Sequence, residues 1–185
     1  KNVVKAALGA LRCKLGRDLG LIKEGHYELL WVIEFPSFEY SEEEGRYMAC
    51  HHPFTSPKDE DVDKLLTDKA NCYSKAYDIV INGYEAGGGS IRIHDQELQE
   101  KVFEAIGMTM EEAHEKFGFF IDTFRYGTPP HGGVGIGLER LIMLLVGTNN
   151  IRDVVAFPKT ASASCLMSDA PNTVDEDQLK KLLKG

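Results

Sequence analysis

Residues 77–93 of this 185-residue chain read YDIVINGYEAGGGSIRI, and their pattern predicts its central strands. Apolar residues alternate with others from Tyr73 to Tyr84, which predicts one long strand. The run Gly87–Gly89 predicts a tight connection from that strand to another one over Ser90–Ile93. Because strands joined by a short turn pair in opposite directions, the stretch predicts an antiparallel sheet.

Helices and further strands are predicted on both sides of this stretch. An apolar run over Leu29–Phe35 predicts a buried strand, and Arg46–His51 the returning strand of a hairpin. Spacings of three and four between apolar residues, together with N-cap residues, predict helices over residues 3–15, 62–66, 95–106, 109–127, 139–145 and 174–183. We therefore expect an α+β fold, in which helices flank an antiparallel β-sheet.

Composition places the chain among ordinary globular proteins, with 43% hydrophobic and 27% charged residues. Its 29 acidic residues outnumber 21 basic ones, so the net charge of -8 has the wrong sign for a chain that grips nucleic acid by itself. Four scattered cysteines form no CxxC pair, which favours free thiols in a reducing compartment, and we expect a cytoplasmic protein. No apolar run of about 18 residues is present, so no membrane partner is expected.

The first candidate site is the glycine-rich stretch GVGIGLER, residues 133–140. Glycines at every second position of a strand share one face, and a face without side chains lets a flat ligand lie against the backbone. Arg140 follows at the junction with a helix and could stack its guanidinium group on an aromatic base. Close packing of a neighbouring helix is the alternative explanation. The spacing is GxGxG, so the dinucleotide-binding and P-loop fingerprints are absent.

The second candidate comprises Asp78, Glu85 and Arg92 around the glycine turn. A regular strand would place the two carboxylates on opposite faces, and a bulge near Asn82–Gly83 would bring them to the same face. They could then hold Mg²⁺ together with phosphate oxygens, while Arg92 offers a fork of N–H groups for a carboxylate. A hairpin with solvated charges is the alternative.

The third candidate is the histidine pair in His51–Phe54. Adjacent residues of a strand point to opposite faces, so His51 and His52 cannot chelate one metal, and no HExxH motif supports a zinc hydrolase. We expect one histidine to face a polar pocket and the other to face structure.

Together, these stretches resemble a known family. The segment GVGIGLERL is similar to motif 3 of class II aminoacyl-tRNA synthetases. The segments HHPFTSPKD, YDIVINGYEAGGGSIRIH, FRYGTPPHGGVGIGLERL and NIRDVVAFPKTASASCLM resemble the bacterial-type aspartyl-tRNA synthetases, in the same order along the chain. The resemblance implies the class II catalytic fold and an aspartate–tRNA ligase, which activates aspartate with ATP to aspartyl-adenylate and transfers the aspartyl group to tRNA.

The resemblance also implies roles for single residues. Arg140 would pack on adenine and, with Glu85, form the catalytic pair. Glu85 would contact ATP and hold Mg²⁺ with Asp78. The remaining ATP-binding positions would be Gly137, Leu138 and Glu139, the last an acidic variant that the motif tolerates. The aspartate-binding positions would be His51 and Arg92.

The resemblance further implies that the chain is one part of a larger enzyme. It starts at Lys1, and AALGALRCKLGRDLGL resembles the end of a domain inserted between motifs 2 and 3. We therefore expect residues 1–20 to be the end of that insertion, and residues 21–185 the C-terminal part of the catalytic domain. Motifs 1 and 2 and the anticodon-binding barrel, through which the parent homodimer would mainly bind tRNA, would lie outside the chain.

Three functions follow as alternatives. In the first, the chain belongs to the ligase and is inactive alone, because groups that contact the transition state are missing. In the second, it is a non-catalytic binding module derived from a synthetase, which would bind ATP or aspartate without turnover. A nicotinamide or flavin oxidoreductase is the third, and it lacks the βαβ pattern that such enzymes require.

Overall fold

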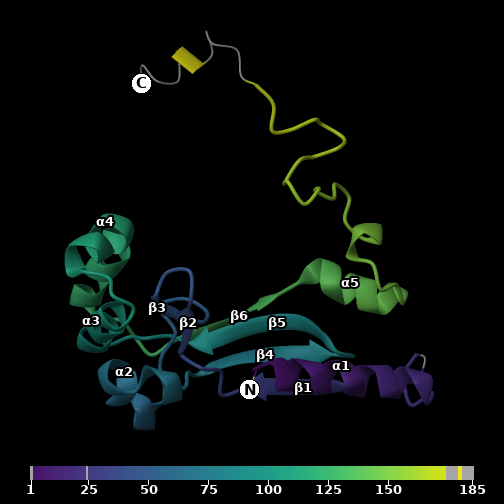
Figure 1. The fold of residues 1–185 in the computed structure, drawn as a ribbon. Helices are drawn as coiled ribbons and strands as arrows, with labels where there is room; N and C mark the ends of the chain where they lie inside the picture. Colours follow the sequence, from purple (N-terminus) through teal and green to yellow (C-terminus); the bar gives the residue numbers. More distant parts are fainter. Residues whose placement is uncertain (1, 24, 174–178, 181–185) are drawn as a thin grey trace. The chain divides into compact units, whose positions relative to one another are not determined.

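The main sheet consists of four antiparallel strands in the order β1-β4-β5-β6 (Figure 1). The structure is a computed structural model that describes residues 2–23, 25–173 and 179–180. The strands of this sheet are β1 (Leu29–Ile33), β4 (Ala76–Ile81), β5 (Tyr84–Ile91) and β6 (Gly132–Ile136). The chain divides into two units, residues 1–136 and 137–185, and the main sheet lies in the first.

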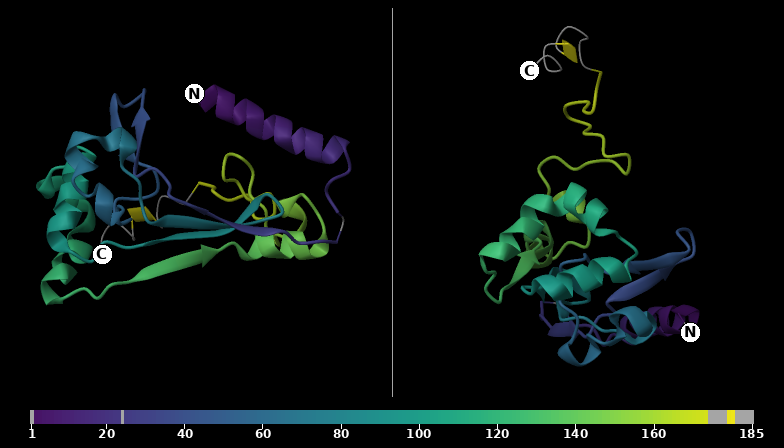
Figure 2. Two further views of the ribbon diagram at one scale, coloured as in Figure 1. Left: turned by 90° about the horizontal axis from the view of Figure 1, so that it is seen from below. Right: turned by 90° about the vertical axis from the view of Figure 1, so that its left-hand side faces the viewer.

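The described part of the first unit also contains a two-stranded sheet, four α-helices and three short 3-10 helices, Asp59–Asp61, Lys69–Asn71 and Asp122–Tyr126. Strands β2 (Phe38–Ser41) and β3 (Arg46–Ala49) form the small sheet, which pairs Phe38 with Ala49. The helices are α1 (Asn2–Asp18), α2 (Lys64–Thr67), α3 (Gln96–Ala105) and α4 (Met110–Ile121), and two views of them are given in Figure 2. The α+β class and the antiparallel sheet are therefore confirmed. The hairpin partner of β3 differs from expectation, because Leu29–Ile33 pairs with β4 instead.

The two best-defined helix starts follow from their capping residues. Asp95 accepts a hydrogen bond from the Leu98 backbone N–H at 2.8 Å before α3 begins. Thr109 and Glu112 form a reciprocal capping box at the start of α4, as their spacing predicts. Because a cap satisfies backbone groups within one turn of the chain, the sequence alone locates these helix ends.

The turn between the central strands lies at a different place from the predicted one. The predicted long strand over residues 73–84 ends at Ile81, and Gly87–Gly89 lies inside β5 rather than in a connection. Asn82 and Gly83 make the turn with positive φ angles of 49° and 84°. A two-residue Asn-Gly turn with both φ angles positive matches the twist of a hairpin, and this was the signal that the three glycines obscured.

The buried core of the first unit lies among the helices and the small sheet. Its largest cluster includes Phe38, Leu65, Ile93, Val102 and Phe103. Strand β1, by contrast, has all five side chains exposed, so the expected buried strand is wrong. An edge strand pairs on one side only, and no described residue covers its faces enough to bury them.

The second unit begins with α5 (Leu138–Val146), which ends at Gly147 with a φ of 77°. Gly147 and Thr148 donate backbone hydrogen bonds to Met143 O, each at 3.1 Å, and so close the last turn. The predicted helix over residues 174–183 lies mostly outside the described residues. None of the helices that the structure describes is both long and apolar enough to cross a membrane.

Candidate functional site

Asp78 and Glu85 lie on the same face of the main sheet. Asp78 pairs with Gly88, and Val80, two residues further along β4, pairs with Glu85. Between these pairs the register shifts by one residue, so that Ala86 is the extra residue of a bulge opposite Ile79 and Val80. Without that shift Glu85 would point to the opposite face, because it is three residues from Gly88. The bulge therefore exists, but at Ala86 rather than near Asn82–Gly83.

The contacts at Gly88 show how close the two carboxylates are. A Cβ atom at this glycine would clash with Asp78 Oδ1 and would lie 3.6 Å from Glu85 Oε1. Partial burial and the nearby Glu85 carboxylate raise the pKa of Asp78, while His51 lowers it. A carboxyl group whose pKa is raised by a neighbouring carboxylate favours a cation beside it.

The residue types fit a magnesium ion that is shared with a phosphate ligand. Mg²⁺ prefers oxygen ligands and is commonly bound by one or two carboxylates plus substrate phosphates. Among the described residues, no group of three or more His, Cys, Asp or Glu side chains could hold a metal without a further ligand. Asp78 and Glu85 offer two carboxylate groups on one face, which suits an ion that phosphate oxygens would also ligate.

Glycines form the floor beside these carboxylates. Gly135 pairs with Gly88 and Gly133 pairs with Ser90, so both belong to the face that carries Asp78 and Glu85. A Cβ atom at Gly133 would meet nothing within 4 Å. The alternating glycines thus leave a flat backbone surface open on this face, as the sequence predicts, and a planar group could lie against it.

Arg92 lies at the end of the same face, next to an open pocket. The pairing of β5 with β6 continues past Ile91, since the Arg92 N–H donates to His131 O at 3.0 Å. The pocket has a volume of about 270 Å³ and is lined by Phe54, Arg92, Phe120, His131, Gly132 and Gly133. A half-buried guanidinium group among aromatic side chains suits a small ligand with a carboxylate.

The two histidines occupy different surroundings. His51 is exposed, and its ring packs edge-on against Phe35 with a centroid distance of 4.9 Å. His52 is half-buried and contacts the Arg92 guanidinium group through Nη1. Partial burial, Arg92 and His51 lower the pKa of His52 to about 4. The structure therefore brings His52 to Arg92, whereas His51 lies within electrostatic range of Asp78.

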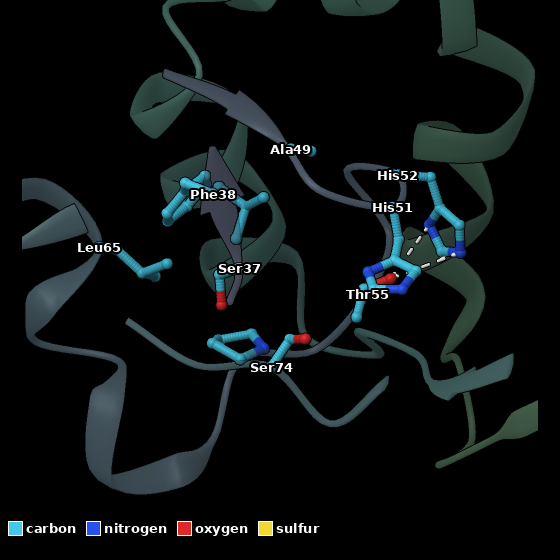
Figure 3. A pocket seen from close by; sticks show the side chains of 10 residues that line it. Ser37, Phe38, Ala49, His51, His52, Thr55, Leu65 and Ser74 are labelled. Atoms are coloured by element: carbon cyan, nitrogen blue, oxygen red, sulfur yellow. Dashed lines mark hydrogen bonds between the residues drawn. The ribbon is translucent and has the colours of Figure 1, made fainter. Parts of the chain in front are cut away.

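A small cavity lies beside His51 and His52 (Figure 3). Its volume of about 10 Å³ is close to that of one water-sized probe, and His51, His52, Thr55, Ser37 and Ser74 are among the residues that line it. A space of this size does not hold an amino acid. The larger pocket at Arg92 is therefore the better candidate for a substrate.

Four of the residues expected to bind ATP belong to the second unit. Gly137 precedes α5 with φ and ψ angles of -76° and 97°, and Leu138, Glu139 and Arg140 form the first turn of this helix. Glu139 lies in the turn where the helix dipole favours an acidic side chain. The strand-to-helix junction that the sequence predicts is present, and the ATP-binding roles of these four residues stay predictions.

Two residues that line the Arg92 pocket, Phe120 and His131, and the Arg92 contact His52 have no role among the sequence-based expectations. Phe120 lies within the helix predicted over residues 109–127, and helical spacing alone does not show that its ring faces a pocket. The Pro129–Pro130 pair immediately before His131 could have been a signal, because it fixes the backbone that leads into β6.

Comparison with known proteins identifies the family. The family model for class II tRNA synthetases (D, K and N) matches residues 9–161. The aspartate–tRNA ligase of Macrococcus caseolyticus is 61% identical over 181 residues, which are 98% of this chain and 31% of that protein. The aspartate–tRNA(Asp/Asn) ligase of Anoxybacillus flavithermus is 59% identical over 182 residues, with the same two shares.

A solved structure shares the fold. The aspartyl-tRNA synthetase of Entamoeba histolytica superimposes with a TM-score of 0.55 at 31% identity, over 80% of this chain and 26% of that one. This chain thus spans about a third of the length of the curated relatives it matches. With a matching family model over most of its residues, the chain belongs to the class II tRNA synthetases of the D, K and N group.

Proposed function

We propose that this chain is the C-terminal part of the catalytic domain of an aspartate–tRNA ligase. The observation that carries the proposal is the shared sheet face, which bears Asp78, Glu85 and a glycine floor and ends at Arg92. The names of the M. caseolyticus and A. flavithermus relatives support aspartate as the amino acid. An arginine at the pocket supports it independently, because a guanidinium group binds a carboxylate better than an amide.

The proposed reaction has two steps. In the first, an α-carboxylate oxygen of aspartate attacks the α-phosphorus of ATP, and the bond to the β-phosphate breaks to release pyrophosphate. In the second, a hydroxyl of the terminal ribose of tRNA attacks the carbonyl carbon of aspartyl-adenylate, and AMP leaves. Both steps depend mainly on positioning and on neutralising phosphate charge, so they need little acid–base work from side chains.

Each group of residues has a part in the first step. Arg92 binds the side-chain carboxylate of aspartate, and His51 closes over the amino acid. Asp78 and Glu85 hold Mg²⁺, which neutralises phosphate charge when ATP is bound. Gly137, Leu138 and Glu139 line the ATP site, and the Arg140 guanidinium group packs on adenine.

The remaining partners follow from the whole enzyme. The parent protein binds tRNA through a domain outside residues 1–185, works as a homodimer and is located in the cytoplasm. Residues 1–20 belong to the end of an inserted domain, and residues 21–185 to the catalytic domain.

Exchange of pyrophosphate into ATP tests this function. We expect the full-length enzyme to catalyse aspartate-dependent exchange, and the 185-residue chain alone to be slower by several orders of magnitude. Removal of one group that stabilises the transition state typically costs about 10²–10³ in rate. Adding the missing N-terminal part in trans should restore part of the exchange.

Two outcomes would contradict the proposal. Exchange that depends on another amino acid in the full-length enzyme would exclude an aspartate ligase. A full-length protein that binds ATP or aspartate without any exchange would favour the non-catalytic binding module.

A further inference from the structure

His52 contacts the guanidinium group of Arg92, and the function proposed above gives this histidine no role. Arg92 Nη1 contacts the Nε2 atom of the His52 ring and lies 3.2 Å from its Nδ1 atom, so it can donate to whichever ring nitrogen carries no proton. The two residues are 40 positions apart in the chain, so the fold brings them together. Because Arg92 lines the 270 Å³ pocket, whatever fixes its guanidinium group also fixes the orientation of the N–H groups that remain for a ligand.

The groups around His52 suit a neutral ring. The Phe54 backbone N–H donates to Nδ1 at 3.2 Å, which adds a second donor beside Arg92. The Thr55 hydroxyl lies 3.4 Å from both ring nitrogens and donates to Ser90 Oγ, so its lone pairs can accept the ring N–H. An imidazolium has no acceptor nitrogen, and only a neutral imidazole can accept from Arg92.

The loop that carries His52 is anchored on the hydrophobic core. The Phe54 ring packs edge-on against Phe117 and Phe120, with centroid distances of 5.1 and 4.7 Å. The buried Gln99 side chain donates from Nε2 to Pro53 O at 2.8 Å. The Phe54 ring contacts and the hydrogen bond to Pro53 O together restrain the loop directly after His52. A residue that orients another side chain needs such a restrained backbone.

We infer that His52 is a positioning residue for carboxylate recognition, which accepts one hydrogen bond from Arg92 and so aims the other N–H groups of the guanidinium at the substrate carboxylate. The inference rests on the proposed function. A neutral partner suits this task, because it fixes Arg92 without cancelling the positive charge that attracts the ligand. An acidic partner at the same place would instead compete with the substrate for Arg92.

The test measures the Michaelis constant for aspartate in pyrophosphate exchange by the full-length enzyme. We expect His52→Ala to raise this constant about 10- to 100-fold, the usual effect of removing a residue that orients a ligand-binding side chain. The kcat and the KM for ATP should change by less than about twofold. Both depend on the residues proposed to bind ATP and Mg²⁺, which are not those proposed to bind aspartate. His52→Gln, whose side-chain oxygen is also a neutral acceptor, should recover most of the affinity.

A double-mutant cycle with Arg92→Ala separates positioning from a general structural effect. In the Arg92→Ala background, His52→Ala should change the aspartate KM by less than about twofold, because the group that it positions is already gone. An equal fold-change in both backgrounds would overturn the inference. Cys50→Ser, an exposed change two residues before His52, is the matched control and should behave as the wild type.

The outcomes also separate this inference from the proposed function. A wild-type enzyme without aspartate-dependent exchange would refute the function itself. An active wild type together with an unchanged KM in His52→Ala would refute only the role of His52. Thermal melting checks each fold, and His52→Leu, which lacks an acceptor but fills the space, replaces His52→Ala if the latter unfolds.

Discussion

At the scale of single residues, a missing side chain at Gly88 allows two carboxylates to share one face. Asp78 Oδ1 occupies the space that a Cβ atom at Gly88 would need, and Glu85 lies at contact distance from the same point. Burial and mutual repulsion raise the pKa of Asp78, so the pair is stabilised by a cation. Glycine is therefore required here for the charge arrangement and not for its φ angle.

Gly88→Ala tests this arrangement. The added methyl group should displace the Asp78 carboxylate and weaken Mg²⁺ binding about tenfold or more, the usual effect of disturbing a metal ligand. The measurement is a Mg²⁺ titration of ATP binding by the full-length enzyme. Gly9→Ala, on the exposed helix α1 with open space around it, is the control and should leave the titration unchanged. An unchanged Mg²⁺ requirement in Gly88→Ala would argue against a metal between Asp78 and Glu85.

The lowered pKa of His52 predicts how stability depends on pH. The folded ring titrates at about 4 and an unfolded histidine near its ordinary value of 6.5, so the unfolded chain takes up the proton first as the pH falls. The contribution of His52 is complete above about pH 6.5 and is lost as the pH falls towards 4. Since the ring is partly solvated, we expect a loss of only about 1–2 kcal/mol.

Urea unfolding of the chain at pH 7 and pH 5 measures this loss. Other ionisable groups of the chain also take up protons as the pH falls. The quantity of interest is therefore the difference in stability loss between the wild type and His52→Gln. The variant has no titrating ring and should lose less stability between the two pH values. Equal losses in both proteins would show that protonation of His52 is not coupled to folding.

At the scale of secondary-structure elements, the β4–β5 hairpin builds the site. Its turn residue Asn82 donates from Nδ2 to His26 O at 3.0 Å, and its Oδ1 atom accepts the Glu28 N–H at 2.8 Å. The bulge at Ala86 then rotates the start of β5, so that Glu85 joins the face of Asp78. Turn and bulge together fix both the register and the direction of the functional side chains.

A pair of glycine substitutions with opposite expected signs tests the turn. Gly83 has open space around it but a φ of 84°, so Gly83→Ala should cost about 1–2 kcal/mol of unfolding free energy through backbone strain alone. Gly118 lies inside α4 at a negative φ with ordinary contacts, and Gly118→Ala should stabilise the chain by up to about 1 kcal/mol. Chemical denaturation gives both values, and a neutral Gly83→Ala would contradict the strained turn.

Helix starts are predicted correctly from the sequence, whereas the turn and the bulge of the β4–β5 hairpin are not. Helix ends at Asp95 and Thr109 were predicted correctly, because each cap depends on residues within one turn. The turn at Asn82–Gly83 was missed, because three consecutive glycines looked like a stronger break than one Asn-Gly pair. The bulge at Ala86 has no local signal, since a bulge is defined by the partner strand.

At the scale of the whole molecule, the net charge of -8 describes only this chain, which spans about a third of its relatives' length. An acidic surface repels a polyanion over long distances, so the chain by itself should attract tRNA weakly. We therefore expect binding of tRNA by residues 1–185 to be undetectable at physiological salt, and we expect the proposed full-length enzyme to bind tRNA with a marked salt dependence.

Filter binding or fluorescence anisotropy at two salt concentrations distinguishes the two cases. Tight, salt-dependent binding by the 185-residue chain would mean that a local basic surface outweighs its net charge. The full-length enzyme under the same conditions is the control, because it establishes that the tRNA is competent.

The sequence by itself determined the family, the α+β class, the helix caps and the residue types of the site, since each of these follows from motifs or from contacts within a few residues. Which side chains meet follows from strand pairing and from the packing of remote segments. Glu85 joins Asp78 because strand pairing creates a bulge, and His52 reaches Arg92 across 40 residues because the loop is anchored on a distant aromatic core. Contacts of this kind depend on the pairing and packing of remote segments, which local spacing does not encode.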